Sequence, residues 1–326
     1  MFKYKNRVLM ILSFTCIINM YGQYISPVLP KDGQMIFTDT VHFQWNTYLN
    51  TQTYHLQVAT DTAFTQLLLN AGVQGNDTVI SGLVPDNTYY WRIMPQGGTY
   101  GPCLKFIYFT PRMIPNLVGW YAADSCHVAD TLNRIDTLYD KSGNGYHLTQ
   151  VTSSKQPTFI VNDTSINNLS TIYFDGANDE FRMNRSIRFA QPNTYCFLWK
   201  LTSPANANAR IAFSGENVNY RNQFGYASAL QTMTIFGGSS SLPGNVTFPI
   251  NFDYTKFVTH FNTTNSKVTK NDNCIFTGDV GNFSMQGLIL GNLHTSGYNM
   301  KGNIPEFIYY HANIDSVQNR LLSQYF

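Results

Sequence analysis

The sequence is poor in charged residues, and in glutamate above all. Only 12% of its 326 residues are charged, and Glu occurs at three positions, Glu180, Glu216 and Glu306. Long exposed helices are usually built from Glu, Lys and Ala, so this shortage argues against a helical protein. The 43% of hydrophobic residues argues against a disordered chain, and the length favours two globular domains.

The chain also lacks an excess of charge of either sign. Its formal charge is +2, but residues 1–22 hold three bases and no acid. Without them, 18 bases (21 less 3) stand against 19 acids, a net charge of −1. A chain so close to neutrality has no electrostatic footprint for nucleic acid or for an anionic membrane surface. We therefore expect no nucleic-acid partner.

Long hydrophobic runs are absent after the first residues. Met1–Arg7 is basic, Val8–Ile18 is an apolar run of 11 residues, and small Gly22 follows a more polar stretch. This layout predicts a secretory signal peptide over residues 1–22. Cys16 would suggest a lipoprotein signal instead, although the residues before it fit that pattern poorly. The expected location is secreted or at the cell surface, with no transmembrane segment after cleavage.

Cysteine is scarce as well, and its spacing is uninformative. The four cysteines after the leader, Cys103, Cys126, Cys196 and Cys274, form no CxxC or Cys/His pattern, which argues against a zinc site. Export permits disulfides, and four cysteines allow three connectivities. Unpaired thiols that behave as small hydrophobic residues are the other interpretation, and both stay open.

The sequence is rich instead in aromatic residues, turn residues and alternating patterns. Between residues 23 and 112, the segments Val41–Trp45, Tyr54–Val58 and Tyr89–Ile93 alternate apolar with polar side chains, which is the period of half-buried strands. Proline and Asp-Gly or Asp-Asn pairs separate them. About seven short strands in about 90 residues predict an immunoglobulin-like sandwich.

Several phrases of residues 23–112 resemble a fibronectin type III domain, in the form found in secreted proteins of the Bacteroidota. They are Ser26-Pro27, Trp45, Leu56–Phe64, Leu83–Ile93 and Phe106–Thr110. The family places a core leucine six residues before a tyrosine whose hydroxyl holds a turn, and Leu83 and Tyr89 have that spacing. The resemblance implies a spacer or adhesion module, in which Trp45 and Trp91 belong to the core and are not sugar platforms.

Residues 113–326 are again strand-like. Expected strands include Leu117–Ala122, two strands about the Asp-Gly turn of Ile172–Met183, Arg210–Ser214, Gln231–Phe236, Lys256–Asn262 and Gly287–Leu293. The tail Asn313–Phe326 predicts a short helix with Asp315-Ser316 at its start.

This second unit resembles the concanavalin A-like lectin/glucanase superfamily, specifically the laminin G-like domains of bacterial surface proteins. The resemblance rests on Leu117–Asp124, Asp140–Gly145, Tyr173–Asp179 and Gly302–Tyr310. It implies a two-sheet jelly roll whose curved face often binds glycans or proteins. Several relatives carry clear metal ligands, and this sequence has no unambiguous set.

Catalytic patterns are missing. Glycanases of this superfamily use acidic residues at alternate strand positions, whereas Glu180, Glu216 and Glu306 stand apart from one another. No Gly-x-Ser-x-Gly elbow and no His-x-x-x-His pair occurs. We therefore expect no catalytic residues and no enzymatic activity, although acids distant in sequence can still meet in the fold.

Two oxygen-rich turns are weak candidates for a calcium site, and no other cofactor is expected. Asp140 begins the turn Asp140–Gly145, and Asp175 and Asp179 flank the turn Gly176–Asn178. Carboxylate, amide and carbonyl oxygens are the ligands that calcium prefers. The same residues also occur together simply because tight turns need side-chain caps and positive φ angles, and this second interpretation is favoured.

The sequence as a whole predicts an exported, non-catalytic protein for adhesion or carbohydrate binding, in which the first unit presents a lectin-like second unit. A glycan or a surface protein is the expected partner. One alternative is an accessory part of a glycoside hydrolase, or a cryptic hydrolase, and another is a purely structural surface component. No Lys/Arg-rich β-sandwich follows residue 326, so we expect no autonomous C-terminal sorting signal.

Overall fold

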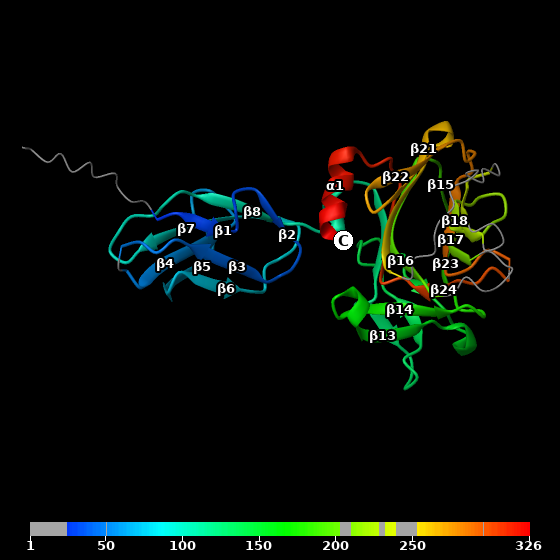
Figure 1. Cartoon of the computed structure of the whole chain (residues 1–326), viewed down its shortest axis with the longest axis horizontal. Helices are drawn as coiled ribbons and strands as arrows, with labels where there is room; N and C mark the ends of the chain where they lie inside the picture. Colours follow the sequence, from blue (N-terminus) through cyan, green and yellow to red (C-terminus); the bar gives the residue numbers. More distant parts are fainter. Residues whose placement is uncertain (1–24, 50, 203–209, 228–231, 239–252, 296) are drawn as a thin grey trace, which may run out of the picture. The chain divides into compact units, whose positions relative to one another are not determined.

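A computed structural model describes residues 25–49, 51–202, 210–227, 232–238, 253–295 and 297–326 (Figure 1). The expected signal peptide, residues 1–22, lies outside them. The chain divides into two compact units between Phe109 and Thr110, close to the expected domain boundary at residue 112. Almost all regular structure is β, which confirms the expected all-β class. Among the described residues, no helix combines the length and the apolar character needed to cross a membrane.

The first unit is a sandwich of a three-stranded sheet, in the order β1-β3-β6, and a five-stranded sheet, in the order β2-β8-β7-β4-β5. Its strands are β1 (Pro27–Leu29), β2 (Gln34–Ile36), β3 (Val41–Trp45), β4 (Thr53–Ala59), β5 (Leu67–Gln74), β6 (Asp77–Ile80), β7 (Asn87–Pro95) and β8 (Leu104–Tyr108).

Aromatic residues from both sheets form the core of this unit. The ring of Phe43 on β3 lies edge-on to Trp91 on β7 at 5.2 Å and to Phe106 on β8 at 5.7 Å. Trp45 and Trp91 are fully buried, as expected of core residues. The alternation in the sequence therefore predicted correctly which side chains face inward.

The expected turn contact of Tyr89 is present. Its ring is buried, and its hydroxyl donates a 2.6 Å hydrogen bond to the backbone carbonyl of Val84. Leu83, the leucine six residues earlier, is buried in the same core. This bond joins the start of β7 to the preceding loop.

Removing this hydroxyl tests the contact directly. Tyr89→Phe is expected to lower the free energy of unfolding of the first unit by about 1 kcal/mol, because the ring stays in place while the Val84 carbonyl loses its donor. Urea denaturation measures the loss. Tyr90→Phe, at the neighbouring position on the other side of the strand, is the matched control and should change stability little. An equal loss in both variants would contradict the assignment.

The second unit is a larger sandwich. One sheet has eight strands in the order β10-β11-β12-β15-β23-β17-β18-β19. The other has nine, with the path β13-β14-β24-β16-β20-β21-β22, and with β25 joining β16 to β9. The elements up to β16 are η1 (Pro111–Met113), β9 (Leu117–Ala122), β10 (Cys126–Val128), β11 (Ile135–Leu138), β12 (Leu148–Thr149), η2 (Ser153–Lys155), β13 (Thr158–Asp163), η3 (Thr164–Ile166), β14 (Leu169–Asp175), β15 (Phe181–Phe189) and β16 (Asn193–Leu201).

The remaining elements are β17 (Arg210–Ser214), β18 (Gln223–Ala227), β19 (Thr232–Phe236), β20 (Thr255–Phe261), η4 (Thr263–Asn265), β21 (Ser266–Lys270), β22 (Asn273–Gly278), β23 (Met285–Leu290), β24 (Lys301–Asn303), β25 (Glu306–Tyr310) and α1 (Ser316–Tyr325). The expected terminal helix is thus confirmed. Asp315 is its N-cap and accepts a 2.8 Å hydrogen bond from the backbone N–H of Gln318, whose side chain in turn accepts from the N–H of Asp315.

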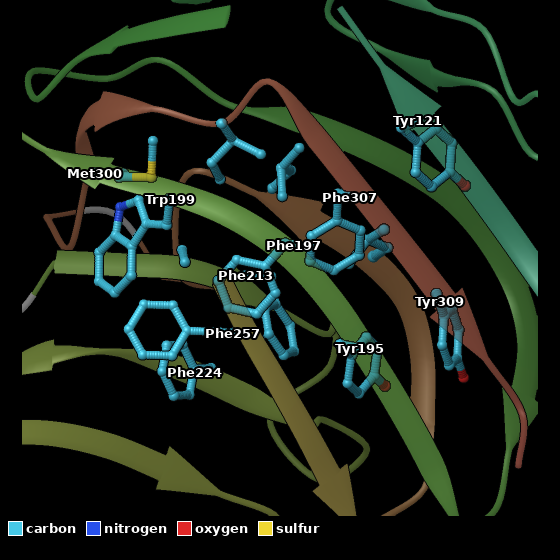
Figure 2. Close-up of a cluster of buried hydrophobic side chains, with 14 of the residues drawn as sticks. Tyr121, Tyr195, Phe197, Trp199, Phe213, Phe224, Phe257, Met300, Phe307 and Tyr309 are labelled. Carbon is cyan, nitrogen blue, oxygen red and sulfur yellow. The ribbon is translucent and has the colours of Figure 1, made fainter. Parts of the chain in front are cut away.

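Aromatic side chains from both sheets meet between them. Phe197 on β16 lies 5.7 Å from Phe257 and 5.6 Å from Phe307 in its own sheet, and 5.4 Å from Phe224 in the other (ring centroids). Figure 2 shows these rings packed in one layer. Since alternate strand residues point to opposite faces, Leu198 and Lys200 lie on the outer face of the nine-stranded sheet.

The turn after β14 changes sheets. The sequence predicts two strands about the Asp-Gly turn, and both exist, but they do not pair with each other. β14 belongs to the nine-stranded sheet and β15 to the eight-stranded one. The segment Gly176–Glu180 therefore carries the chain from one sheet of the sandwich to the other.

Candidate functional site

The structure separates the calcium candidates. Asp140 accepts hydrogen bonds from the backbone N–H groups of Trp120, Ser142 and Tyr146, at 2.8–3.0 Å, and from the hydroxyl of Ser142 at 2.7 Å. Both oxygens of its carboxylate are therefore occupied by donors from its own turn and from β9. This is the arrangement of a turn cap.

Asp175 and Asp179, in contrast, lie together. The backbone N–H of Asp175 donates a 2.8 Å hydrogen bond to Oδ2 of Asp179, while Oδ1 of Asp175 accepts from Ala177 and Asn178. Asp179 is only 4% exposed. Burial, together with the charge of Asp175, raises the pKa of Asp179 to about 7. Two carboxylates lie close together here, as a calcium site would require, but one of them resists ionisation.

The described residues contain no group of three or more His, Cys, Asp or Glu side chains that could hold a metal ion. Calcium takes six to eight oxygens, and each of these turns commits carboxylate oxygens to backbone N–H groups. The hydrogen-bond pattern thus favours turn caps.

A melting scan with calcium and then with a chelator tests this expectation. We expect equal melting temperatures, because neither turn offers enough free oxygens. If a calcium site exists, a hundredfold excess over its dissociation constant would add about 2.7 kcal/mol to the stability. A shift of several degrees that disappears in Asp179→Asn would overturn the turn-cap interpretation.

The four cysteines of the described residues are free thiols. Cys103 and Cys274 are exposed, Cys126 is partly buried and Cys196 is fully buried. Burial raises the pKa of the Cys126 thiol to about 11, so it stays protonated at neutral pH. The thiol interpretation therefore holds in this structure, and none of the three disulfide connectivities is formed.

Glu180 and Glu216 lie near each other in the fold, although they are 36 positions apart in the sequence (216 less 180). Glu180, just before β15, accepts hydrogen bonds from Nε and Nη2 of Arg182 at 3.0 and 2.9 Å, and from Nδ2 of Asn292 at 3.0 Å. Glu216 lies near both Glu180 and Arg182. Burial raises the pKa of Glu216 to about 7, and the charge of Glu180 adds to this shift while Arg182 opposes it.

The backbone makes room for Glu216. Gly287 on β23 has a φ of +62°, and a Cβ at that position would stand 2.5 Å from Oε2 of Glu216. Only glycine suits both conditions. The cluster of Glu180, Arg182 and Glu216 is thus built by β15, β23 and the end of β17, three neighbours in the eight-stranded sheet.

This pair is poorly suited to hydrolysis. A glycosidase needs one protonated carboxyl and one carboxylate with a free lone pair. Glu216 resembles the first, but both oxygens of Glu180 are held by Arg182, and Lys155 Nζ is 3.9 Å from one of them. The cluster is better described as a buried ion pair beside a carboxyl that burial tends to keep neutral.

Two pockets of the second unit lie on the other sheet. Two adjoining pockets share Ile166 and Leu198, and we call them together the α1 groove. The Glu306 pocket, about 250 Å³, is also lined by Ala122, Ala123, Asp124, Asn168, Leu169, Ser170, Pro305 and Glu306. The Tyr254 pocket, about 330 Å³, is also lined by Tyr254, Lys256, Asn271, Asp272, Ser323 and Phe326. The groove runs over the outer face of the nine-stranded sheet, between η3 and the end of α1.

Strand pairing and the terminal helix create the Tyr254 pocket. Leu198 on β16 stands directly opposite Lys256 on β20. The Lys256 ammonium lies 2.7 Å from Oδ1 of Asp272, in the β21–β22 turn, and the Ser323 hydroxyl of α1 donates to the same carboxylate. The Tyr254 hydroxyl donates a 2.8 Å hydrogen bond to Asp163 at the end of β13. Tyr254 is therefore held by its hydroxyl end at one side of the pocket.

Glu306 anchors α1 to the sheet at the other pocket. Its Oε1 accepts hydrogen bonds from Nε1 of Trp120 at 2.5 Å and from the hydroxyl of Tyr325 at 2.7 Å. Burial raises the pKa of Glu306 to about 7, against the effect of these two donors. In the sequence Glu306 is only an isolated acid, because its partners Trp120 and Tyr325 lie 186 and 19 positions away.

Neither a protein-family model nor a curated protein matches this chain. Among solved structures, domain 4 of AbnA, an extracellular arabinanase from Geobacillus stearothermophilus, in complex with arabinotriose, is similar at 17% identity and a TM-score of 0.42. The match covers 64% of this chain and 98% of that one.

Two further solved structures are similar. Trypanosoma rangeli sialidase in complex with the inhibitor DANA matches at 11% identity and a TM-score of 0.46, over 92% of this chain and 52% of that one. The Botulinum neurotoxin serotype G binding domain matches at 12% identity and a TM-score of 0.43, over 64% of this chain and 51% of that one. The chain thus spans about half the length of these two. At such identities and TM-scores the likenesses carry no argument about activity. The structure itself sets the class: over the described residues, this is an all-β protein of two sandwiches with one short C-terminal helix.

Proposed function

We propose that this is an exported, non-catalytic protein for glycan binding or adhesion, and that its glycan binds in the α1 groove. The observation that carries the proposal is the composition of the Tyr254 pocket. It is lined by two aromatic residues, Tyr254 and Phe326, by Asn271 and by the charged pair Lys256–Asp272. Aromatic faces stack on sugar rings while amide and charged groups bind the hydroxyls.

The two units support this proposal in different ways. The sandwich of the first unit and the Tyr89–Val84 bond agree with a fibronectin type III-like spacer. The two large sheets of the second unit agree with a laminin G-like lectin unit. Export is proposed from the N-terminal sequence alone, in which a basic start precedes an apolar run.

The non-catalytic part of the proposal is supported by Glu180. A carboxylate that already accepts two hydrogen bonds from Arg182 and one from Asn292 has little capacity left to act as a nucleophile or base. A cryptic glycoside hydrolase remains the second candidate, because Glu216 has the raised pKa of a general acid and lies near a second carboxylate.

Glycan arrays followed by titration calorimetry test the binding. We expect a dissociation constant on the order of 0.1 mM, which is about −5.5 kcal/mol. Tyr254→Ala should weaken binding about tenfold, because the ring that stacks on the sugar is removed. Tyr254→Phe keeps the ring and should retain most of the affinity. Tyr298→Ala, at an exposed tyrosine that does not line the groove, is the matched control.

Other outcomes separate the alternatives. Binding that survives Tyr254→Ala would place the site elsewhere. Reducing ends released from a polysaccharide, and lost in Glu216→Gln, would establish the hydrolase. A protein that neither binds any glycan nor releases sugar would leave the structural surface component.

A further inference from the structure

The Glu306 pocket adjoins the Tyr254 pocket, so a glycan seated on Tyr254 meets it with its next substituent. The two pockets share Ile166 and Leu198, so they lie side by side on the surface. Their chemistry differs. Ala122, Ala123 and Pro305 add apolar surface to the Glu306 pocket, and Glu306 supplies a carboxyl.

The carboxyl of Glu306 has one oxygen left for a ligand. The hydrogen bonds within the described part of the chain use Oε1, which accepts from Trp120 and Tyr325. Oε2 takes part in none of them. When ionised, this oxygen can accept an amide N–H, and when protonated it can donate to a carbonyl.

A ligand that fits such a pocket combines a small apolar group with an amide. A plain hydroxyl can pair with Oε2 but leaves the apolar surface of Ala122, Ala123 and Pro305 uncovered. A methyl group alone would leave Oε2 unpaired. The side chain of Asp124, which pairs with Lys141 at 2.8 Å, also lines the pocket.

We propose that the α1 groove selects glycans built from N-acetylated hexosamines, whose acetamido group enters the Glu306 pocket. The methyl group lies against Ala123 and Leu198, and the amide bonds Oε2 of Glu306. The sugar ring itself stays on the aromatic side of the groove. This inference rests on the proposed glycan binding and names its substrate class.

Chitotriose and cellotriose test the inference, because they share the β-1,4 glucose backbone and differ only in the acetamido groups. We expect chitotriose to bind at least about tenfold more tightly in calorimetric titrations of the full protein. Ser170→Leu fills the Glu306 pocket from a partly exposed position of β14 that does not line the Tyr254 pocket. It should remove this preference by weakening chitotriose binding more than cellotriose binding.

A second variant keeps the inference testable if Ser170→Leu fails to fold. Leu169 is 59% exposed at the rim of the same pocket, so Leu169→Ser should fold normally and reduce the preference for chitotriose by about threefold. Equal affinities for the two trisaccharides, or a preference that both variants keep, would overturn the acetamido assignment while glycan binding stands. A protein that binds no glycan of the array would overturn the proposed function itself.

Discussion

Asp179→Asn is expected to be more stable than the wild type by about 2–4 kcal/mol at pH 8, and no more stable at pH 4. The carboxyl of Asp179 is 4% exposed and lies beside Asp175, which raises its pKa from 3.8 to about 7. At pH 8 the wild type must hold this buried charge. The asparagine holds none, and its Oδ1 can still accept the N–H of Asp175.

The sign follows from the direction of the pKa shift. A carboxyl whose pKa is higher in the folded state binds its proton more tightly there, so its contribution to stability is fully present below pH 3.8. That contribution is lost as the pH rises through about 7. The stability difference between variant and wild type should therefore grow between these two values and stay constant above them. Urea denaturation at several pH values measures it.

A comparison of variants is needed, because other groups titrate over the same range. Glu216 and Glu306 have pKa values raised to about 7, which acts in the same direction as Asp179. Burial lowers the pKa of His260 to about 4 and also lowers that of His294, which acts in the opposite direction. The pH profile of the wild type alone is their sum, whereas the difference between variant and wild type isolates Asp179.

Asp175→Asn is the matched control. It removes the neighbouring charge but not the burial, and burial is the larger cause of the shift. It should therefore stabilise the protein at pH 8 by less than Asp179→Asn does. If Asp179→Asn is instead less stable than the wild type at every pH, the charge of Asp179 has a favourable partner, and a bound cation becomes the first candidate.

The strands were predictable because each one leaves a local trace in the sequence. Val41–Trp45, Leu117–Ala122 and Arg210–Ser214 are strands over those same residues. Alternation or a run of buried residues reflects whether one or both faces are covered. The terminal helix was predictable for the same reason, since Asp315 and Gln318 form its N-cap within four residues.

The local sequence does not show which sheet a strand joins, or which residues distant in the chain come together in the fold. Nothing local in Ile172–Met183 says that β14 and β15 belong to different sheets, because this depends on pairing with strands outside the segment: β13 and β24 for β14, and β12 and β23 for β15. Glu216 meets Glu180 only through the order β15-β23-β17. Glu180 and Arg182, two residues apart on the same side of a strand, were the one local sign of that cluster.

The α1 groove could not be predicted from the sequence for the same reason. The lining of its Tyr254 pocket comes from η3, β16, β20, the β21–β22 turn and α1, and Leu198 and Phe326 are 128 positions apart (326 less 198). Aromatic residues alone do not reveal such a site in this sequence, because many of them, such as Phe224 and Tyr226, are buried in the core. Tyr254 follows an uninformative stretch, and only the fold places it beside Leu198.

Phe197→Ala is expected to remove about 3–5 kcal/mol from the free energy of unfolding of the second unit and to leave the first unit unchanged. The Phe197 ring is fully buried and contacts aromatic rings of both sheets, at 5.7 Å from Phe213 and 5.6 Å from Phe307. Its loss opens a cavity between two sheets that cannot both collapse into it. Phe197→Leu refills most of the volume and should cost clearly less.

Trp91→Ala is the reciprocal variant, since Trp91 is fully buried in the core of the first unit. If each unit has its own core, each substitution lowers one calorimetric transition and spares the other, because none of the described buried residues belongs to both clusters. Both transitions moving together in either variant would mean that the units unfold as one. The spacer role proposed for the first unit depends on the first result, because a module that presents another must remain folded when its partner opens.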